Sequence, residues 1–326
     1  MDNKVSRRTV ITGLTAMIAA PAVIGTSPFI APARAERLPL TPQEVSGDGV
    51  TLTIRDYSAR FLDFHAAAQG LDPDARWKAW QDRYGFAAVP PGPEGEAVAR
   101  RLLDAAWHRY PAALPLIRHG AAGMTPAPLD SAVAIARLFR ATAPMRIGIV
   151  AYVGGFEDNA FTAGTPDGPL VCLPIEMDPA RRAMLMPHEM THAVHMLLAK
   201  LPADYERPLG RLLFEEGLAM HAVAALRPGL ADWAYVGEQP WYDAGLARRA
   251  DILAAITPLL DASDGPTLFR FTMGQGATGR EREAYLAAWL VMGALLRQGR
   301  TLPDLVRLPA DAIVPLVRET LAGIPG

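Results

Sequence analysis

Cysteine is almost absent from this chain of 326 residues, which contains only Cys172. A single cysteine excludes an internal disulfide and any metal site built from several thiolates. Its neighbours read PLVCLPI and are apolar, which favours a thiol packed in the core over an exposed nucleophile. Histidine and carboxylate side chains are then the remaining candidates for metal ligands.

The sequence also lacks an excess of charge of either sign. Its 32 Lys and Arg residues nearly balance its 34 Asp and Glu residues, for a formal net charge of -2. This balance gives no reason to expect nucleic acid as a partner. Hydrophobic residues make up 50% of the chain and charged residues 20%, which is typical of a globular protein with a large buried core.

An uninterrupted apolar run long enough to span a membrane is missing near the N-terminus. The run from Val10 to about Ile24 is broken by threonines, a glycine and a proline, which makes it a poor membrane span. It follows a basic start and precedes Ala33-Arg34-Ala35, a small-x-small cleavage motif. Residues 1–35 are therefore predicted to be a signal peptide, and the mature chain to be periplasmic or secreted with a mildly acidic net charge.

The basic start resembles a twin-arginine signal. It reads Ser6-Arg7-Arg8-Thr9, and twin-arginine export carries folded proteins, so that a cofactor can be loaded before transport. Val10 and Ile11 stand where that pattern favours phenylalanine and leucine. An ordinary secretory signal with two adjacent arginines is the alternative.

The mature chain, residues 36–326, is predicted to be one mainly helical α+β domain. Residues 36–140 are expected to form a helical N-terminal part, with helical patterns from 56 onward. Two short segments rich in Val and Ile, at 145–155 and 168–177, favour strands. Helical patterns then return at about 179–200, 208–225, 241–260, 281–299 and 309–322, so that one small sheet accompanies many helices.

The strongest chemical signal is His188-Glu189-Met190-Thr191-His192, inside the helical pattern that begins at Asp178-Pro179. Residues i and i+4 of a helix project from one face about 6 Å apart, so two imidazoles can converge on one zinc ion. Glu189 borders the open side of such a metal, where it could take a proton from a zinc-bound water. His195 lies on the same face but about 10 Å along the axis from His188, too far to share the ion.

Catalytic zinc usually takes a third protein ligand, and Glu216 in RPLGRLLFEEGLAMHAVAAL is the best candidate. Helical spacing places it inside an apolar stripe, where a carboxylate needs a cationic partner. A salt bridge, for instance to Arg211, is the alternative to zinc. The adjacent Gly217 is expected to let this helix approach the His188 helix closely.

HEMTH at 188–192, followed by EEGLA at 215–219, resembles the gluzincin zinc metallopeptidases. More narrowly, the chain from about Met145 to Leu321 is similar to a poorly characterised bacterial family described as predicted zinc-dependent proteases. That family carries a Glu-Gly-Leu-Ala segment after the histidine motif. The resemblance implies a zincin-like catalytic core, at residues 141–326, with a small β-sheet packed on the HExxH helix.

The resemblance further implies a role for each matching residue. The ligands of Zn²⁺ would be His188, His192 and Glu216, and the general base would be Glu189. Thermolysin-like members carry an acidic residue four positions after the glutamate ligand. In this chain that position is Met220. Asn159-Ala160-Phe161 resembles the edge-strand segment that pairs with substrate, which makes Asn159 and Ala160 candidates for substrate binding; a plain turn is the alternative.

An oxyanion donor is also needed when water attacks a carbonyl. The available candidates are Tyr285, His221, Tyr242 and Tyr235, and Tyr285 is preferred, although an aromatic residue on a helix is often simply part of the core.

The expected function is that of an exported zinc metallopeptidase that hydrolyses peptide bonds of a peptide or protein substrate through a zinc-activated water. Two alternatives remain. The first is a zinc-binding envelope protein without turnover, against which the presence of Glu189 argues, because a purely structural site does not use that carboxylate. The second is a metal-dependent hydrolase of non-peptide amides or esters. A His2Glu set suits zinc best among the divalent metals.

Overall fold

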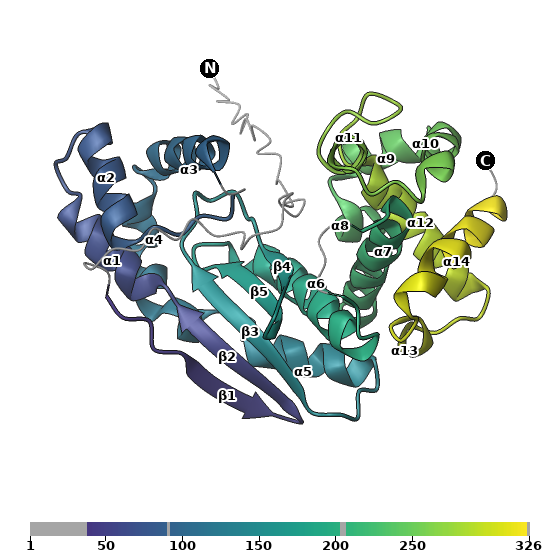
Figure 1. Cartoon of the computed structure of the whole chain (residues 1–326), viewed down its shortest axis with the longest axis horizontal. Helices are drawn as coiled ribbons and strands as arrows, with labels where there is room; N and C mark the ends of the chain where they lie inside the picture. Colours follow the sequence, from purple (N-terminus) through teal and green to yellow (C-terminus); the bar gives the residue numbers. More distant parts are fainter. Residues whose placement is uncertain (1–37, 90–91, 203–206, 325–326) are drawn as a thin grey trace, which may run out of the picture.

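The computed structural model describes residues 38–89, 92–202 and 207–324. The predicted signal peptide, residues 1–35, lies outside the described residues. Within the described part of the chain, no helix combines the length and the apolarity that a membrane span requires. The expected class is confirmed, because many helices surround one small mixed sheet (Figure 1).

The sheet has five strands in the order β1-β2-β3-β5-β4. Neighbouring strands β2, β3 and β5 run parallel, and β1 and β4 are antiparallel edge strands. The two predicted strands are β3 and β5, and β4 lies in the segment between them. The bounds are β1 (Gln43–Gly47), β2 (Val50–Asp56), β3 (Met145–Tyr152), β4 (Phe161–Thr165) and β5 (Gly168–Pro174). Cys172 is buried in β5, as its apolar neighbours predicted.

The expected helical N-terminal part, residues 36–140, begins with two strands that the sequence analysis did not anticipate, β1 and β2, before the predicted helices start. The segment VTLTIRD alternates, with Val50, Leu52 and Ile54 buried and the threonines between them partly exposed. Asp48 and Gly49 turn the chain between the two strands with positive φ angles of 46° and 79°. Because β2 pairs with β3, a boundary at residue 140 would divide one sheet, and the two parts form a single fold.

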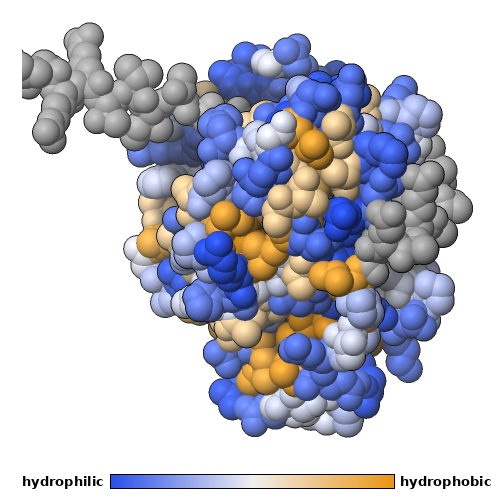
Figure 2. Space-filling model, turned by 90° about the vertical axis from the view of Figure 1, so that its left-hand side faces the viewer, coloured by the Kyte–Doolittle hydropathy of each residue, from blue (hydrophilic) through white to orange (hydrophobic). Residues whose placement is uncertain are grey.

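Five helices follow β2 and agree with the predicted helical region. They are α1 (Ser58–Ala67), α2 (Pro73–Arg83), α3 (Pro93–Ala106), α4 (Tyr110–His119) and α5 (Pro128–Leu138). Helices α1 to α4 gather at one end of the sheet, whereas α5 packs on β2 and on α6 (Figure 1). On the side of the molecule that α1 and α2 occupy, hydrophobic residues form small patches between hydrophilic ones (Figure 2), as on most protein surfaces.

The C-terminal half of the chain is helical. Its helices are α6 (Pro179–Leu198), α7 (Leu209–Leu226), α8 (Trp233–Val236), α9 (Gln239–Leu246), α10 (Arg249–Ile256), α11 (Gly265–Thr272), α12 (Glu283–Arg297), α13 (Leu302–Leu305) and α14 (Ala310–Ala322). The helix predicted at 241–260 is divided into α9, α10 and a short 3-10 turn. The other four predicted helices in this half match α6, α7, α12 and α14.

Helix α6 connects the sheet to this helical half. Asp178 caps its N-terminus by accepting a hydrogen bond from the backbone N–H of Ala180 at 2.8 Å, and Pro179 occupies the first turn, as predicted. One side of α6 packs on β4 and β5 and the other on α7. Such an element is buried on most of its circumference, so its polar side chains need partners within the protein.

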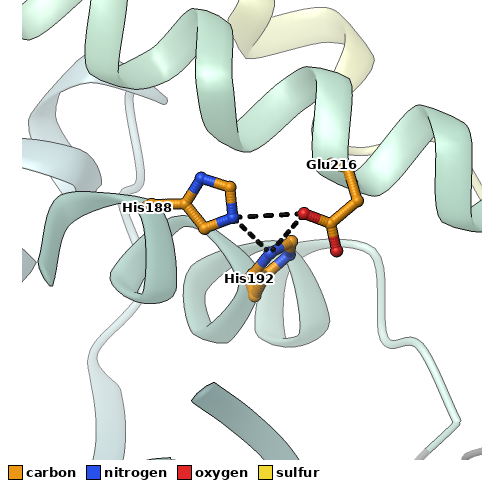
Figure 3. A group of neighbouring side chains, drawn as sticks. All are labelled: His188, His192 and Glu216. Carbon is orange, nitrogen blue, oxygen red and sulfur yellow. Dashed lines mark hydrogen bonds and ion pairs between the residues drawn. The ribbon is translucent and has the colours of Figure 1, made fainter. Parts of the chain in front are cut away.

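Helix α7 packs most extensively on α12. A Cβ atom at Gly217 would lie 2.4 Å from the backbone oxygen of Ala288 and 2.9 Å from Cβ of Met292, both in α12. The predicted close approach of Gly217 to the His188 helix is therefore wrong. The glycine is needed where α7 meets α12. The preceding residue, Glu216, faces α6 instead (Figure 3).

Candidate metal centre

His188 and His192 of α6 and Glu216 of α7 point toward one another across the interface between the two helices (Figure 3). Nε2 of His188 lies 3.2 Å from Oε2 of Glu216 and 3.2 Å from Nε2 of His192. Nε2 of His192 lies 3.7 Å from the same Oε2. The sequence prediction that these three side chains converge is confirmed.

The separations between the three donor atoms suit a small tetrahedral metal ion. Ligands at the usual zinc distances of about 2.0–2.1 Å stand about 3.4 Å apart along the edge of a tetrahedron. The three observed separations lie close to this value. Two imidazoles and one carboxylate also form a donor set that zinc accepts. The buried group of His188, His192 and Glu216 could therefore hold a metal ion.

The carboxylate of Glu216 is buried yet ionised. Burial alone would raise its pKa, but His192 and His188 outweigh this effect and hold the pKa well below the ordinary value. The second oxygen, Oε1, faces Nη2 of Arg207 at 3.7 Å. Glu216 thus presents one oxygen to the two imidazoles and the other to a cation.

The salt bridge to Arg211, which was the alternative to zinc for Glu216, is formed by the neighbouring residue Glu215. Its two oxygens lie 2.7 Å from Nε of Arg211 and 3.0 Å from Nε of Arg207. These two arginines lower the pKa of Glu215 despite its burial. Because Arg211 is committed to Glu215, the salt bridge to Arg211 considered for Glu216 does not form, and Glu216 is directed to the histidines.

Glu189 lies beside the three donors without belonging to their group. Its Oε2 is 2.8 Å from the hydroxyl of Thr162 in β4, and this hydroxyl is also 2.9 Å from the backbone oxygen of Glu189. Burial raises the pKa of Glu189 to about 7, although His188 and Thr162 act in the opposite direction. A carboxyl group with a pKa near neutrality is suited to accept and return a proton at physiological pH.

His195 does not join the group, as its distance along the helix predicted. It is buried in α6, its ring packs against Phe214 with a centroid distance of 5.9 Å, and its Nε2 has no hydrogen-bond partner. Burial lowers its pKa to about 4, so the ring is neutral. It is a core histidine.

The four candidates for an oxyanion donor differ in what their polar atoms contact. Nε2 of His221 lies 3.1 Å from the backbone oxygen of Trp289. The hydroxyls of Tyr235 and Tyr242 donate to the backbone oxygen of Arg227 at 2.6 Å and to Asp232 at 3.4 Å. These three groups therefore have other partners.

Tyr285 differs from these candidates. Its hydroxyl has no hydrogen-bond partner among the described residues, and its side chain lines a pocket together with His188. Burial and the charge of Glu216 raise its pKa, so that the group stays protonated and can donate. The role of Tyr285 as oxyanion donor stays a prediction, which its position in the pocket beside His188 favours.

Asn159 and Ala160 precede the edge strand β4 and are buried. The side-chain amide of Asn159 donates to the backbone oxygen of Ala88 at 3.0 Å, and its own backbone oxygen accepts a hydrogen bond from the hydroxyl of Tyr152. These contacts fix the start of β4. Substrate binding by Asn159 and Ala160 stays a prediction. The strand β4, whose start they fix, contacts Glu189 through Thr162.

Two polar neighbours of the site could not be recognised from the sequence. Thr162 is one of two threonines in a short strand, and Arg207 follows a segment without a regular pattern. Neither has a motif of its own, and each is brought to the site only by the packing of β4 and α7 against α6. The sequence signal for the site came from the HEMTH and EEGLA segments and their helical spacing.

Comparison with known proteins gives no relative. No family model, no curated protein and no solved structure matches this chain.

Proposed function

We propose that this protein is an exported zinc-dependent metallopeptidase that hydrolyses peptide bonds. The observation that supports this proposal most strongly is the position of Glu189: a carboxyl group with a pKa of about 7, held by Thr162 beside two histidines and a glutamate. A site that served only to hold a metal would not need this additional buried carboxyl group, which is costly to bury.

His188, His192 and Glu216 are the residues that would hold the ion. When bound, zinc lowers the pKa of a coordinated water and polarises a carbonyl group. Glu189 accepts the proton from the attacking water and afterwards delivers it to the leaving amine. The protonated hydroxyl of Tyr285, which shares a pocket with His188, donates a hydrogen bond to the carbonyl oxygen as negative charge develops there.

The edge strand β4 offers a means to orient an extended peptide. It pairs with β5 on one side only among the described residues, and Thr162 places it against Glu189. A peptide that adds to the free edge of such a strand is held by backbone hydrogen bonds, largely independent of its side chains. In this arrangement the scissile bond would run alongside the general base.

The deciding experiment compares the purified mature chain with Glu189→Gln. Both proteins are analysed for bound metal, and both are incubated with a mixed peptide library before and after treatment with a chelator. We expect equal metal content in the two proteins, and turnover about 10² to 10⁴ times slower for the variant, the usual contribution of a general base. Chelation should abolish the activity of the wild type.

Two results would reject the proposal in favour of its alternatives. Metal binding without turnover of peptides, esters or amides would leave a zinc-binding protein without catalysis. Turnover of simple amides or esters, with no peptide cleaved, would instead assign the site to non-peptide substrates. N-terminal sequencing of the exported protein tests the cleavage after residue 35 independently of activity.

A further inference from the structure

A pocket beside the candidate metal centre lies where α6, α7, α8 and α12 meet. It shares His188 and Tyr285 with the centre, and methionine, leucine and valine side chains of α6, α7 and α8 form much of its wall. Two arginines also line it, Arg181 in the first turn of α6 and Arg282 immediately before α12. A largely apolar pocket with a few polar groups is typical of a binding site for a small group.

The two arginines are held in place by the fold. Arg181 precedes His188 by seven residues on one face of α6, which places the two Cα atoms about 10 Å apart along the helix. The guanidinium carbon of Arg282 lies 4.6 Å from the ring centroid of Tyr285 and 6.0 Å from that of Trp241. Arg282 also has a positive φ of 64°, a backbone conformation uncommon for residues other than glycine and often found at functional sites.

Neither arginine has an anionic partner among the described residues. Arg207 and Arg211 both form ion pairs with Glu215. Among the described residues, Arg181 and Arg282 form no such ion pair, and Asp158 and Glu238 act on Arg181 only through their charges. Their Nε atoms are buried and without hydrogen-bond partners. Among the described residues, the one hydrogen bond of the Arg282 side chain goes to the backbone oxygen of Val236, at 3.5 Å.

The two arginines are close enough for the charge of Arg282 to act on Arg181. Burial lowers the pKa of Arg181, and the charge of Asp158 acts against this. The positive charge of Arg282 lowers the pKa further, and the charge of Glu238 raises it. Two guanidinium groups that repel each other in a half-buried pocket are stabilised by an anion between them. A carboxylate is suited to this role, because it can accept two parallel hydrogen bonds from one guanidinium group.

We propose that this pocket binds a carboxylate of the substrate and makes the enzyme selective for peptides that carry one near the scissile bond. The inference rests on the proposed peptidase function. Since an extended peptide advances about 3.3 Å per residue, the distance along α6 places the carboxylate within about three residues of the bond that is cut. The apolar wall accommodates the rest of that residue. The carboxylate belongs either to the C-terminus of the peptide or to an Asp or Glu side chain.

The test measures binding separately from turnover. Fluorescence anisotropy gives the Kd of the metal-loaded protein for dansyl-Gly-Gly-Leu with a free carboxylate and for the same peptide as a carboxamide. A second pair, dansyl-Gly-Gly-Glu-amide and dansyl-Gly-Gly-Gln-amide, tests the side-chain source. We expect the acid of at least one pair to bind about tenfold to a hundredfold more tightly, the usual contribution of a charge-assisted hydrogen bond. The pair that shows the preference identifies the source.

Variants show whether the two arginines cause the preference. Arg181→Gln and Arg282→Gln should each reduce the ratio of the two Kd values, and the double variant should abolish it. Arg297→Gln is the matched control, because Arg297 is exposed at the opposite end of α12. This control should keep the full ratio.

Two outcomes overturn the inference. One is that acid and amide of both pairs bind the wild type equally, within about twofold, a comparison that needs no variant. The other is that the preference persists in the double arginine variant. If acids bind selectively through the arginines but no peptide is hydrolysed, only the proposed peptidase function fails, and the pocket remains a carboxylate site.

Discussion

The hydroxyl of Thr162 in β4 lies 2.8 Å from Oε2 of Glu189 in α6. This contact connects the edge strand β4 with the carboxyl group that we propose as general base. The same hydroxyl lies 2.9 Å from the backbone oxygen of Glu189, so the strand and the helix are held at a fixed separation at this point. A substrate strand paired with β4 would meet the base in a defined position.

Replacement of Thr162 by valine should alter the pH dependence of the activity. The hydroxyl lowers the pKa of Glu189, so its loss raises that pKa. The base must be ionised to accept a proton, and activity is therefore lost as the pH falls through the pKa. We expect the acidic limb of the kcat/KM profile of Thr162→Val to move to higher pH, together with a lower maximum.

Thr162→Ser is the matched control for this experiment, because it keeps the hydroxyl and removes only a methyl group. Its acidic limb should coincide with that of the wild type. An unchanged or lowered limb for Thr162→Val would argue against the contact with Glu189 as the cause.

Glu216→Gln should release the metal. The amide keeps the shape of the side chain but loses the negative charge that balances the cation, so zinc content after dialysis should fall from about one ion per chain to nearly none. Elemental analysis measures this directly. Glu176→Gln serves as the control, since Glu176 is a similarly buried carboxyl group that does not belong to the candidate metal ligands. Retention of zinc by Glu216→Gln would contradict the assignment of Glu216 as a ligand.

Gly217→Ala should destabilise the protein. Its new methyl group would lie 2.4 Å from the backbone oxygen of Ala288, so α7 and α12 must move apart, at a cost of about 1–3 kcal/mol in the free energy of unfolding. Urea denaturation measures this loss. Ala225→Ser is the control, because it adds one atom at an exposed position of the same helix. It should leave the free energy of unfolding nearly unchanged. An equal effect of both substitutions would show that the α7–α12 contact is not tight.

Glu176→Gln should stabilise the protein at alkaline pH. Burial, and then the charge of Glu157, raises the pKa of Glu176 from 4.5 to about 8. The folded state therefore keeps a proton that the unfolded state releases, and the free energy of unfolding falls as the pH rises from 4.5 to about 8. Glutamine resembles the protonated carboxyl group and can still accept the hydrogen bond from the N–H of Gly154, 2.9 Å away in the wild type.

Thermal unfolding at pH 5 and pH 8 distinguishes the two proteins. The wild type should lose more stability between these pH values than Glu176→Gln does. Glu319→Gln, at an exposed position of α14, should behave as the wild type. A variant that is less stable than the wild type at pH 8 would show that Glu176 is ionised in the folded protein.

Local patterns in the sequence predicted the helices of the site because their causes are local. The Asp178-Pro179 start fixed the beginning of α6, and helical spacing placed His188 and His192 on one face. The same reasoning missed β1 and β2, although VTLTIRD alternates between buried and partly exposed residues. Their hairpin is only marginally stable alone, and its parallel pairing with β3 joins segments almost a hundred residues apart.

The amino-acid sequence by itself determined which side chains can bind a metal ion: two imidazoles four residues apart and a carboxylate inside an apolar helix. Only the tertiary structure decided that Glu216 turns to the histidines while Glu215 pairs with Arg211, that Gly217 serves the contact with α12, and that Arg181 and Arg282 line one pocket. The physical reason is that spacing along a helix sets the direction of a side chain relative to its own axis, whereas its partner depends on which helix packs against that face.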